Sequence, residues 1–163
     1  MRSIYKIVVC SLLTLSITSC EKDLLEKEQY QKEIYLIGAY NRVWTTEVSY
    51  SNEEVKTYFT VSSSGTLALD RDVNVKMKIN EELVDIYNKK YWTVLNEDKY
   101  YKSLDTDLYS IPSLENTVIK HAEGISAEVP VLIKTASLKI DQSYVIPVEI
   151  ESTTGYPISE SGY

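Results

Sequence analysis

Side chains that could do catalytic chemistry are sparse in this sequence. His121 is the only histidine among 163 residues, so a nucleophilic triad or a histidine-based zinc site lacks its partners. We expect it to be a surface or half-buried residue. A glycosidase needs two carboxylates about 5–10 Å apart in a cleft, and no pattern here places such a pair in one. The sequence therefore indicates a protein that is not an enzyme and has no catalytic residues.

The acidic pairs also offer little to a metal ion. Asp105 and Asp107 lie in a stretch rich in turn formers, and Asp70 and Asp72 flank an arginine. Calcium prefers six or more oxygen ligands, and neither pair comes with the remaining ligands of a calcium loop. Solvated turns are the favoured interpretation. The five glycines are scattered singly, so no phosphate-binding loop is present. We expect neither a metal nor a cofactor.

Aromatic residues are the best candidates for binding. Sugar rings stack on flat aromatic side chains that have polar neighbours. The candidates for such a site are Trp92, Tyr100, Tyr101 and Tyr109, with Trp44 as a further plausible contact. The aromatic cluster meets a loop rich in Asp, Ser and Thr. The alternative is that these rings pack in or near the core, and that interpretation is favoured for each residue taken singly.

The first twenty residues are typical of a signal peptide. Arg2 and Lys6 precede an apolar run that is too short to span a bilayer. The run ends in Ile17-Thr18-Ser19-Cys20, which resembles the lipobox of bacterial lipoproteins. We expect cleavage before Cys20, lipidation of its thiol and attachment to the outer membrane, on either face. Residues 21–33 are charged and predict a tether, and residues 34–163 predict a single domain.

The charge balance excludes some partners. Without residues 1–20 the chain has 15 basic and 24 acidic residues. Such an acidic surface argues against binding nucleic acid or an anionic membrane. Cys20 is then the only cysteine, so no disulfide can form within the chain, and its core must stabilise the fold.

Most of the domain follows a strand pattern. Apolar and polar residues alternate clearly along residues 73–79, 127–133 and 144–150. Further strands are expected at residues 33–40, 43–50, 55–62, 66–69 and 117–121. Between them, residues 80–91 predict a short helix capped by Asn80 and packed on a sheet, and residues 103–113 predict a loop. The predicted fold is all-β: an antiparallel immunoglobulin-like sandwich with one short helix.

The two prolines in the last strands carry a further expectation. Pro130 and Pro147 each lack the amide that a sheet ladder uses. One or both strands should therefore have an edge or a bulge at the proline.

The order of these motifs resembles the domain of unknown function 1735 family, found in lipoproteins of Bacteroidota. The resemblance rests on VNVKMKI followed by NEELVDIYN and YWTVLNEDKYY, and on a closing signature through Leu138, Tyr144, Pro147 and Val148. It covers most of residues 33–158. Asn96 stands where the family usually has proline. The chain also ends at Tyr163, where a last strand would be expected, so it is either a shortened member or a truncated reading frame.

The resemblance implies a non-catalytic, sandwich-like module on surface lipoproteins, often near glycan-capture systems. Glu21-Lys22-Asp23 also loosely resembles the surface-export signals of such lipoproteins, with a solvated linker as the equal alternative. Two functional hypotheses follow. The first is a surface-anchored accessory module that binds glycans or acts as a spacer, with glycans or neighbouring surface proteins as partners. The alternative is an assembly subunit that acts by strand addition.

Lipidation gives the first testable prediction. Replacing Cys20 by alanine removes the sulfur that carries the lipid, so Cys20→Ala should abolish palmitate labelling and leave an unprocessed or soluble protein. Metabolic labelling of the two proteins measures this directly. Normal labelling of the variant would show that the chain is not a lipoprotein.

Overall fold

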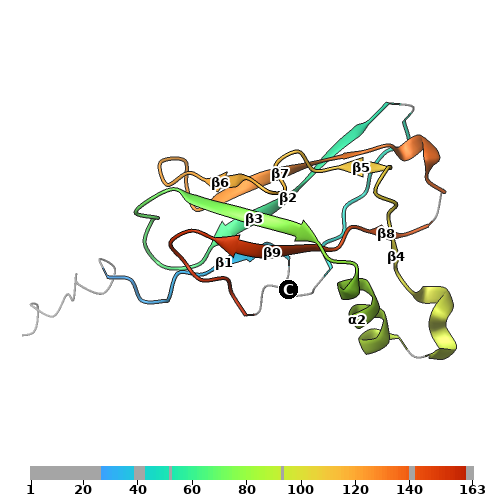
Figure 1. Cartoon of the computed structure of the whole chain (residues 1–163), viewed down its shortest axis with the longest axis horizontal. Coiled ribbons are helices and arrows are strands. Elements are labelled where there is room, and N and C mark those ends of the chain that lie inside the picture. The colour runs from blue at the N-terminus through green and yellow to red at the C-terminus, as the bar shows by residue number, and fades with distance from the viewer. Residues whose placement is uncertain (1–26, 39–42, 52, 93, 140–141, 161–163) are drawn as a thin grey trace, which may run out of the picture.

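The structure is a computed structural model that describes residues 27–38, 43–51, 53–92, 94–139 and 142–160. Two antiparallel sheets face each other as a sandwich (Figure 1). The first sheet has the order β1 (Ile34–Leu36), β2 (Val55–Ser63), β7 (Ser126–Ile133) and β5 (Tyr109–Ser110). The second has the order β6 (Thr117–Ile119), β3 (Val73–Ile79) and β9 (Val148–Thr153). The predicted all-β sandwich is confirmed.

Smaller elements lie at one end of the sandwich. A two-stranded parallel pair joins β4 (Lys102–Ser103) to β8 (Tyr144–Val145). Helix α2 (Glu82–Tyr91) follows β3, and the two 3-10 helices are η2 (Val94–Lys99) and η3 (Thr135–Ser137). Among the described residues α2 is the only α-helix, and no helix there is long and apolar enough to cross a membrane.

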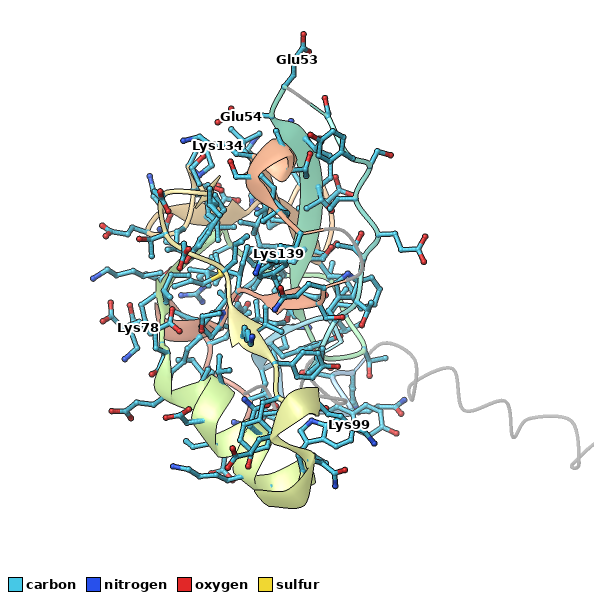
Figure 2. All side chains as sticks on the ribbon, turned by 90° about the vertical axis from the view of Figure 1, so that its right-hand side faces the viewer. Glu53, Glu54, Lys78, Lys99, Lys134 and Lys139 are labelled. Carbon is cyan, nitrogen blue, oxygen red and sulfur yellow. The ribbon has the colours of Figure 1, made fainter. Side chains whose placement is uncertain are left out.

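Alternating side chains build the core between the sheets. In β3 the side chains of Val73, Val75 and Met77 are buried, while the intervening polar residues face water. They pack against residues of the opposite sheet such as Val61 and Val129. Charged residues point outward, as Figure 2 shows for those that it labels. Fully burying one such aliphatic side chain stabilises the fold by about 1.5–3 kcal/mol.

Some of the expected strands are present, and others are not. Strands β2, β3, β6 and β7 lie where alternation predicted them. Residues 43–50 and 66–69 form no strand, so those two predictions are wrong. Residues 103–113 are not a continuous loop, because β5 and the end of β4 lie within them. Each of these short strands pairs with a partner far along the chain, and local patterns do not record such pairing.

Both prolines stand where a ladder is incomplete, as predicted. Pro130 of β7 lies opposite Tyr58 of β2. On the other edge of β7, β5 pairs only with Leu132 and Ile133, so its ladder does not extend to Pro130. Pro147 lies between β8 and β9, so the predicted strand over residues 144–150 is broken in two.

Helix α2 does not lie on a sheet face, which corrects the sequence-based expectation. Figure 1 shows it beyond the end of β3 and β9. Asn80 begins the turn, since its Oδ1 accepts a hydrogen bond from the amide of Glu82 at 3.2 Å. Asn88, which is only 4% exposed, then joins the helix to the segment that leads into β4. Its Nδ2 donates to the carbonyl of Tyr101 at 3.0 Å, and its Oδ1 accepts from the Tyr101 amide at 2.9 Å.

We expect Asn88→Ala to lower the free energy of unfolding by about 2–4 kcal/mol, because it leaves both backbone groups of Tyr101 without their partner. Urea denaturation measures the change. The matched control is Asn74→Ala on an exposed strand position, which should cost under about 0.5 kcal/mol. Equal effects of the two substitutions would contradict the role assigned to Asn88.

Candidate functional site

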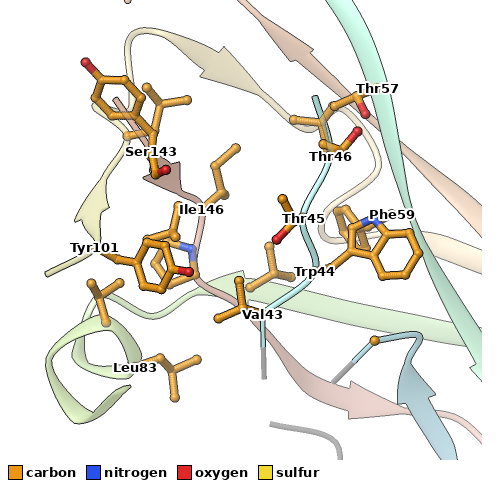
Figure 3. A pocket seen from close by; sticks show the side chains of 18 of the residues that line it. Val43, Trp44, Thr45, Thr46, Thr57, Phe59, Leu83, Tyr101, Ser143 and Ile146 are labelled. Carbon is orange, nitrogen blue, oxygen red and sulfur yellow. The ribbon is translucent and has the colours of Figure 1, made fainter. Parts of the chain in front are cut away.

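A groove of about 980 Å³ opens at the end of the sandwich that carries α2. Its walls are α2, the extended residues 43–48 and residues 142–148, and its floor comes from β2 and β7. Figure 3 shows Val43 and Thr45 on one side, and Tyr101 and Ile146 on the other. The groove exists because these connecting segments cover the apolar end of the core incompletely.

Aromatic side chains stand on both sides of the groove. On the helix side, the ring of Tyr87 lies 4.5 Å from that of Tyr91 and 5.5 Å from that of Tyr101, measured between centroids. Burial raises the pKa of the Tyr87 hydroxyl above its usual value. On the opposite side, Trp44 is 60% exposed. Flat apolar faces are therefore available from two directions.

Polar groups in the groove are mostly uncharged. Hydroxyl and amide side chains come from Thr45, Thr46, Thr57, Gln142 and Ser143. The lining residues include one acid, Glu47, and one base, Lys90. The groove thus combines apolar faces with hydrogen-bonding groups, and its formal charges cancel within an acidic protein.

Of the four residues proposed from the sequence as ligand contacts, only Tyr101 lines the groove. Trp92 lies beyond the end of α2, with the Nζ of Lys99 5.7 Å from its ring centroid. The hydroxyl of Tyr109 and the indole nitrogen of Trp92 are buried and have no hydrogen-bond partner in the described part of the chain. Tyr109 packs against a core cluster formed by Leu104, Val131 and Ile133. Tyr100 is half-buried and outside the groove.

The structure adds groove residues that the sequence did not single out. Tyr58, Tyr87, Tyr91 and Tyr144 come from β2, α2 and β8. Their positions depend on pairings between distant segments, so no local motif marks them. Trp44 had been named as plausible, and it does line the groove. Cys20, the proposed lipidation site, lies outside the described residues.

The acidic residues outside the groove make local contacts. Asp72 accepts hydrogen bonds from the backbone amide of His121 at 3.0 Å and interacts with its ring Nδ1 at 2.6 Å. These bonds lower the pKa of the Asp72 carboxyl. In the part of the chain that the structure describes, no three His, Cys, Asp or Glu side chains are grouped to hold a metal ion.

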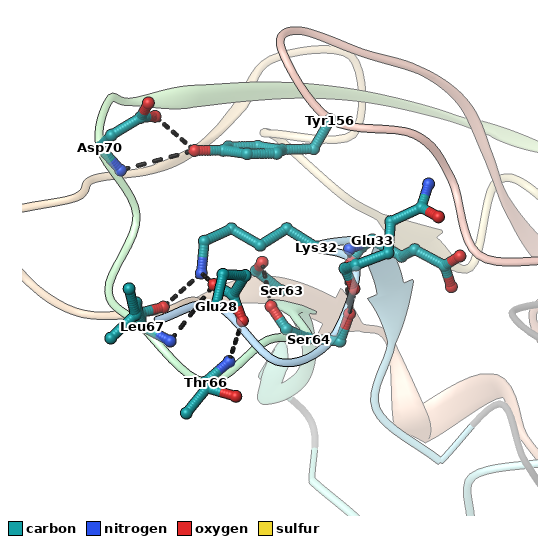
Figure 4. A network of polar contacts seen from close by, with 10 residues as sticks. Glu28, Lys32, Glu33, Ser63, Ser64, Thr66, Leu67, Asp70 and Tyr156 are labelled. Atoms are coloured by element: carbon teal, nitrogen blue, oxygen red, sulfur yellow. Dashed lines mark hydrogen bonds and ion pairs between the residues drawn. The ribbon is translucent and has the colours of Figure 1, made fainter. Parts of the chain in front are cut away.

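At the opposite end of the sandwich, the described part of the tether contacts the domain (Figure 4). Glu28 accepts hydrogen bonds from the amides of Thr66 and Leu67 and pairs with Lys32. Lys32 in turn donates to the carbonyl of Leu67. Ser64 Oγ accepts from the amide of Glu33 at 2.9 Å. Residues 28–33 are therefore docked on the turn after β2.

The comparisons with known proteins agree on the fold. A family model described as an N-terminal domain matches residues 30–157. A protein of unknown function from Bacteroides ovatus is similar in structure, with a TM-score of 0.57 and 12% identity, over 76% of this chain and 40% of that one. A multidomain protein including DUF1735, also from Bacteroides ovatus, has a TM-score of 0.56 and 16% identity, over 76% and 41%. No curated protein matches.

These two structures set the scale of the likeness. The chain spans about two fifths of the length of each. Identities this low carry the fold alone, so the site must be judged from its own geometry.

The Glu28 contact predicts an unusual titration. The hydrogen bond from Lys32, followed by that from the Thr66 amide, lowers the pKa of Glu28 from 4.5 to about 2. A lowered carboxyl pKa stabilises the contact above pH 4.5, and that contribution is lost as the pH falls toward 2. In NMR spectra, the Thr66 amide shift should therefore titrate with a midpoint near 2.

Two variants test the assignment. Glu28→Gln should abolish the titration, because no ionising group then faces the amide. Lys32→Met should move the midpoint upward, because it removes the largest cause of the shift. A midpoint near 4.5 in the unmodified chain would contradict the docked arrangement of residues 28–33.

Proposed function

Because this chain belongs to the domain of unknown function 1735 family, we propose that it is a lipid-anchored accessory module that binds glycans in the groove. The family has no established function, so the proposal depends on the site. The observation that carries it is the groove itself, with exposed aromatic faces beside hydroxyl and amide groups. A sugar ring has an apolar face and a polar rim, and this lining complements both.

Binding without hydrolysis fits the lining better than catalysis does. Glycoside hydrolysis uses two carboxylates that flank the bond to be cleaved. Glu47 is the one carboxylate among the described residues that line the groove. A second acid or a nucleophilic thiol is not among them. The groove can therefore hold a sugar chain, and it offers no acid and base pair to cleave it.

The position of the tether supports display from a membrane. Residues 28–33 dock on the turn that contains Gly65. Helix α2 lies at the other end of the sandwich (Figure 1), and it forms one wall of the groove. A chain anchored through Cys20 would then present the groove away from the lipid. An accessory protein that captures glycans at the cell surface needs this orientation.

A second candidate function is strand addition by a partner. Residues 43–48 make no backbone hydrogen bonds with one another or with the other residues that the structure describes. They are extended and border the groove, so a partner peptide could pair with them. The edge of β1 is less available, because Ile34 bridges Ile158 and accepts a hydrogen bond from the Ser159 amide at 2.9 Å.

We expect Trp44→Ala and Tyr101→Ala to weaken glycan binding by about tenfold or more, because each removes a stacking face. A glycan array with the chain from residue 21 onward identifies the ligand, and calorimetry measures the affinities. That chain contains every element described here.

The matched control is Tyr50→Ala, which removes an aromatic side chain that is 63% exposed and outside the groove. It should bind as the unmodified chain does. Loss of affinity at an unchanged melting temperature supports the glycan site. If the array shows no binding and the protein pairs with a peptide or with itself, strand addition is the better explanation.

A further inference from the structure

Gly38 follows β1 and has a backbone conformation that favours glycine, with φ of +89°. Its second constraint is steric. A Cβ atom built at this position would lie 2.7 Å from Cε3 of Trp44 and 3.3 Å from the Cβ of that residue. The indole therefore occupies the space that any other side chain at position 38 would fill.

This contact holds the Trp44 indole against the backbone and leaves part of the ring open for stacking. We call this supported ring the platform. The part of the indole around Cε3 and Cδ2 packs on the glycine backbone, while the side chain remains 60% exposed. A large apolar ring left in water at a groove is typical of a binding contact, since its burial is favourable only when a ligand arrives. Figure 3 shows the Trp44 ring next to Phe59, and the side chain of Thr45, the next residue, on the other side of the segment.

The surroundings of the platform select among ligands by charge. Among the described residues that line the groove, Glu47 and Lys90 are the only formally charged ones, and their charges cancel. The protein as a whole carries a net charge of −7. Uronic or sulfated sugars are repelled by that overall charge and find no cluster of basic residues in the groove. Uncharged sugars are not repelled by the overall charge and need no basic residues in the groove.

The flat indole selects by ring shape. A pyranose with all substituents equatorial can stack through either of its two C–H faces, whereas an axial hydroxyl obstructs one of the two. Chains of β-1,4-linked glucose or xylose combine such rings with an extended shape that suits an open groove. Bent α-linked chains do not.

We propose that Gly38 is a positioning residue that seats Trp44 as a platform for uncharged, all-equatorial sugar units of extended β-1,4-linked chains. This inference rests on the proposed glycan-binding function. It adds the ligand class and the residue that prepares the platform.

The test uses Gly38→Ala in a Trp92→Phe background, so that Trp44 is the only tryptophan. The control is Gly124→Ala, because Gly124 also has positive φ, +137°, but has nothing within 4 Å of a built Cβ. Fluorescence of Trp44 and its quenching by acrylamide are measured without ligand. Binding is measured with cellohexaose and xylohexaose, and with maltohexaose and oligogalacturonate as comparators.

We expect Gly38→Ala to change the Trp44 quenching and to weaken binding of a β-1,4-linked oligosaccharide by about tenfold. Gly124→Ala should change neither. Trp44→Phe should retain more affinity than Trp44→Leu, because it keeps a flat ring. This rescue separates a stacking role from a packing role, and equal losses in the two variants would overturn the platform.

The remaining outcomes separate this inference from the proposed function. If the oligosaccharides bind and Gly38→Ala binds as tightly as the unmodified chain, the role of Gly38 is overturned while glycan binding stands. If maltohexaose or oligogalacturonate binds in preference, the ligand class is overturned and glycan binding still stands. If no glycan binds, on the array or in solution, the proposed function fails and this inference fails with it.

Discussion

The packing of the two sheets against each other is the constraint on which the rest of the structure depends. The buried side chains of β3, which are Val73, Val75 and Met77, meet Val61 of β2 and Val129 of β7 across the interface. Ile34 of β1 is fully buried at one side. This packing is continuous at the end near β1 and the docked tether. Toward α2 the sheets leave an apolar end formed by residues such as Val131 and Ile133, which connecting segments must cover.

Those connecting segments are held by hydrogen bonds from buried polar side chains as well as by apolar contacts of residues such as Val48 and Ile146 with the core. Asn88 holds the backbone of Tyr101, and Thr135 holds residues 49–51. The Thr135 hydroxyl accepts from the amide of Ser51 at 2.9 Å and lies 3.2 Å from the carbonyl of Ser49. Such hydrogen bonds fix two points of a segment and leave the stretch between them only partly packed on the core. The groove lies between these fixed points. Residues 43–48 border it and have no strand partner in the described part of the chain.

The parts of the fold that could be predicted from the sequence are those in which one residue's environment is set by its neighbours in the chain. Alternation in β3 is visible because each apolar side chain enters the same core. Residues 43–50 alternate in a similar way, yet no strand in the described part of the chain pairs with them, since pairing requires a partner that the pattern does not contain. The short lengths of β5 and β8 were not predictable for the same reason, because each pairs over only two residues with a distant segment.

The candidate site was less predictable for a related reason. Composition identifies aromatic residues as candidates but does not separate a ring in the core from one in a groove, and Tyr101 and Tyr109 differ only in this respect. Tyr101 is held at the groove by its hydrogen bond with Asn88, whereas Tyr109 lies beside β7 because β5 pairs with that strand. The position of the Trp44 ring depends on Gly38, six positions earlier. Glycine has no side chain, so hydrophobic patterns in the sequence do not reveal this contact. In this fold, the position of an aromatic ring is decided by the backbone that supports it.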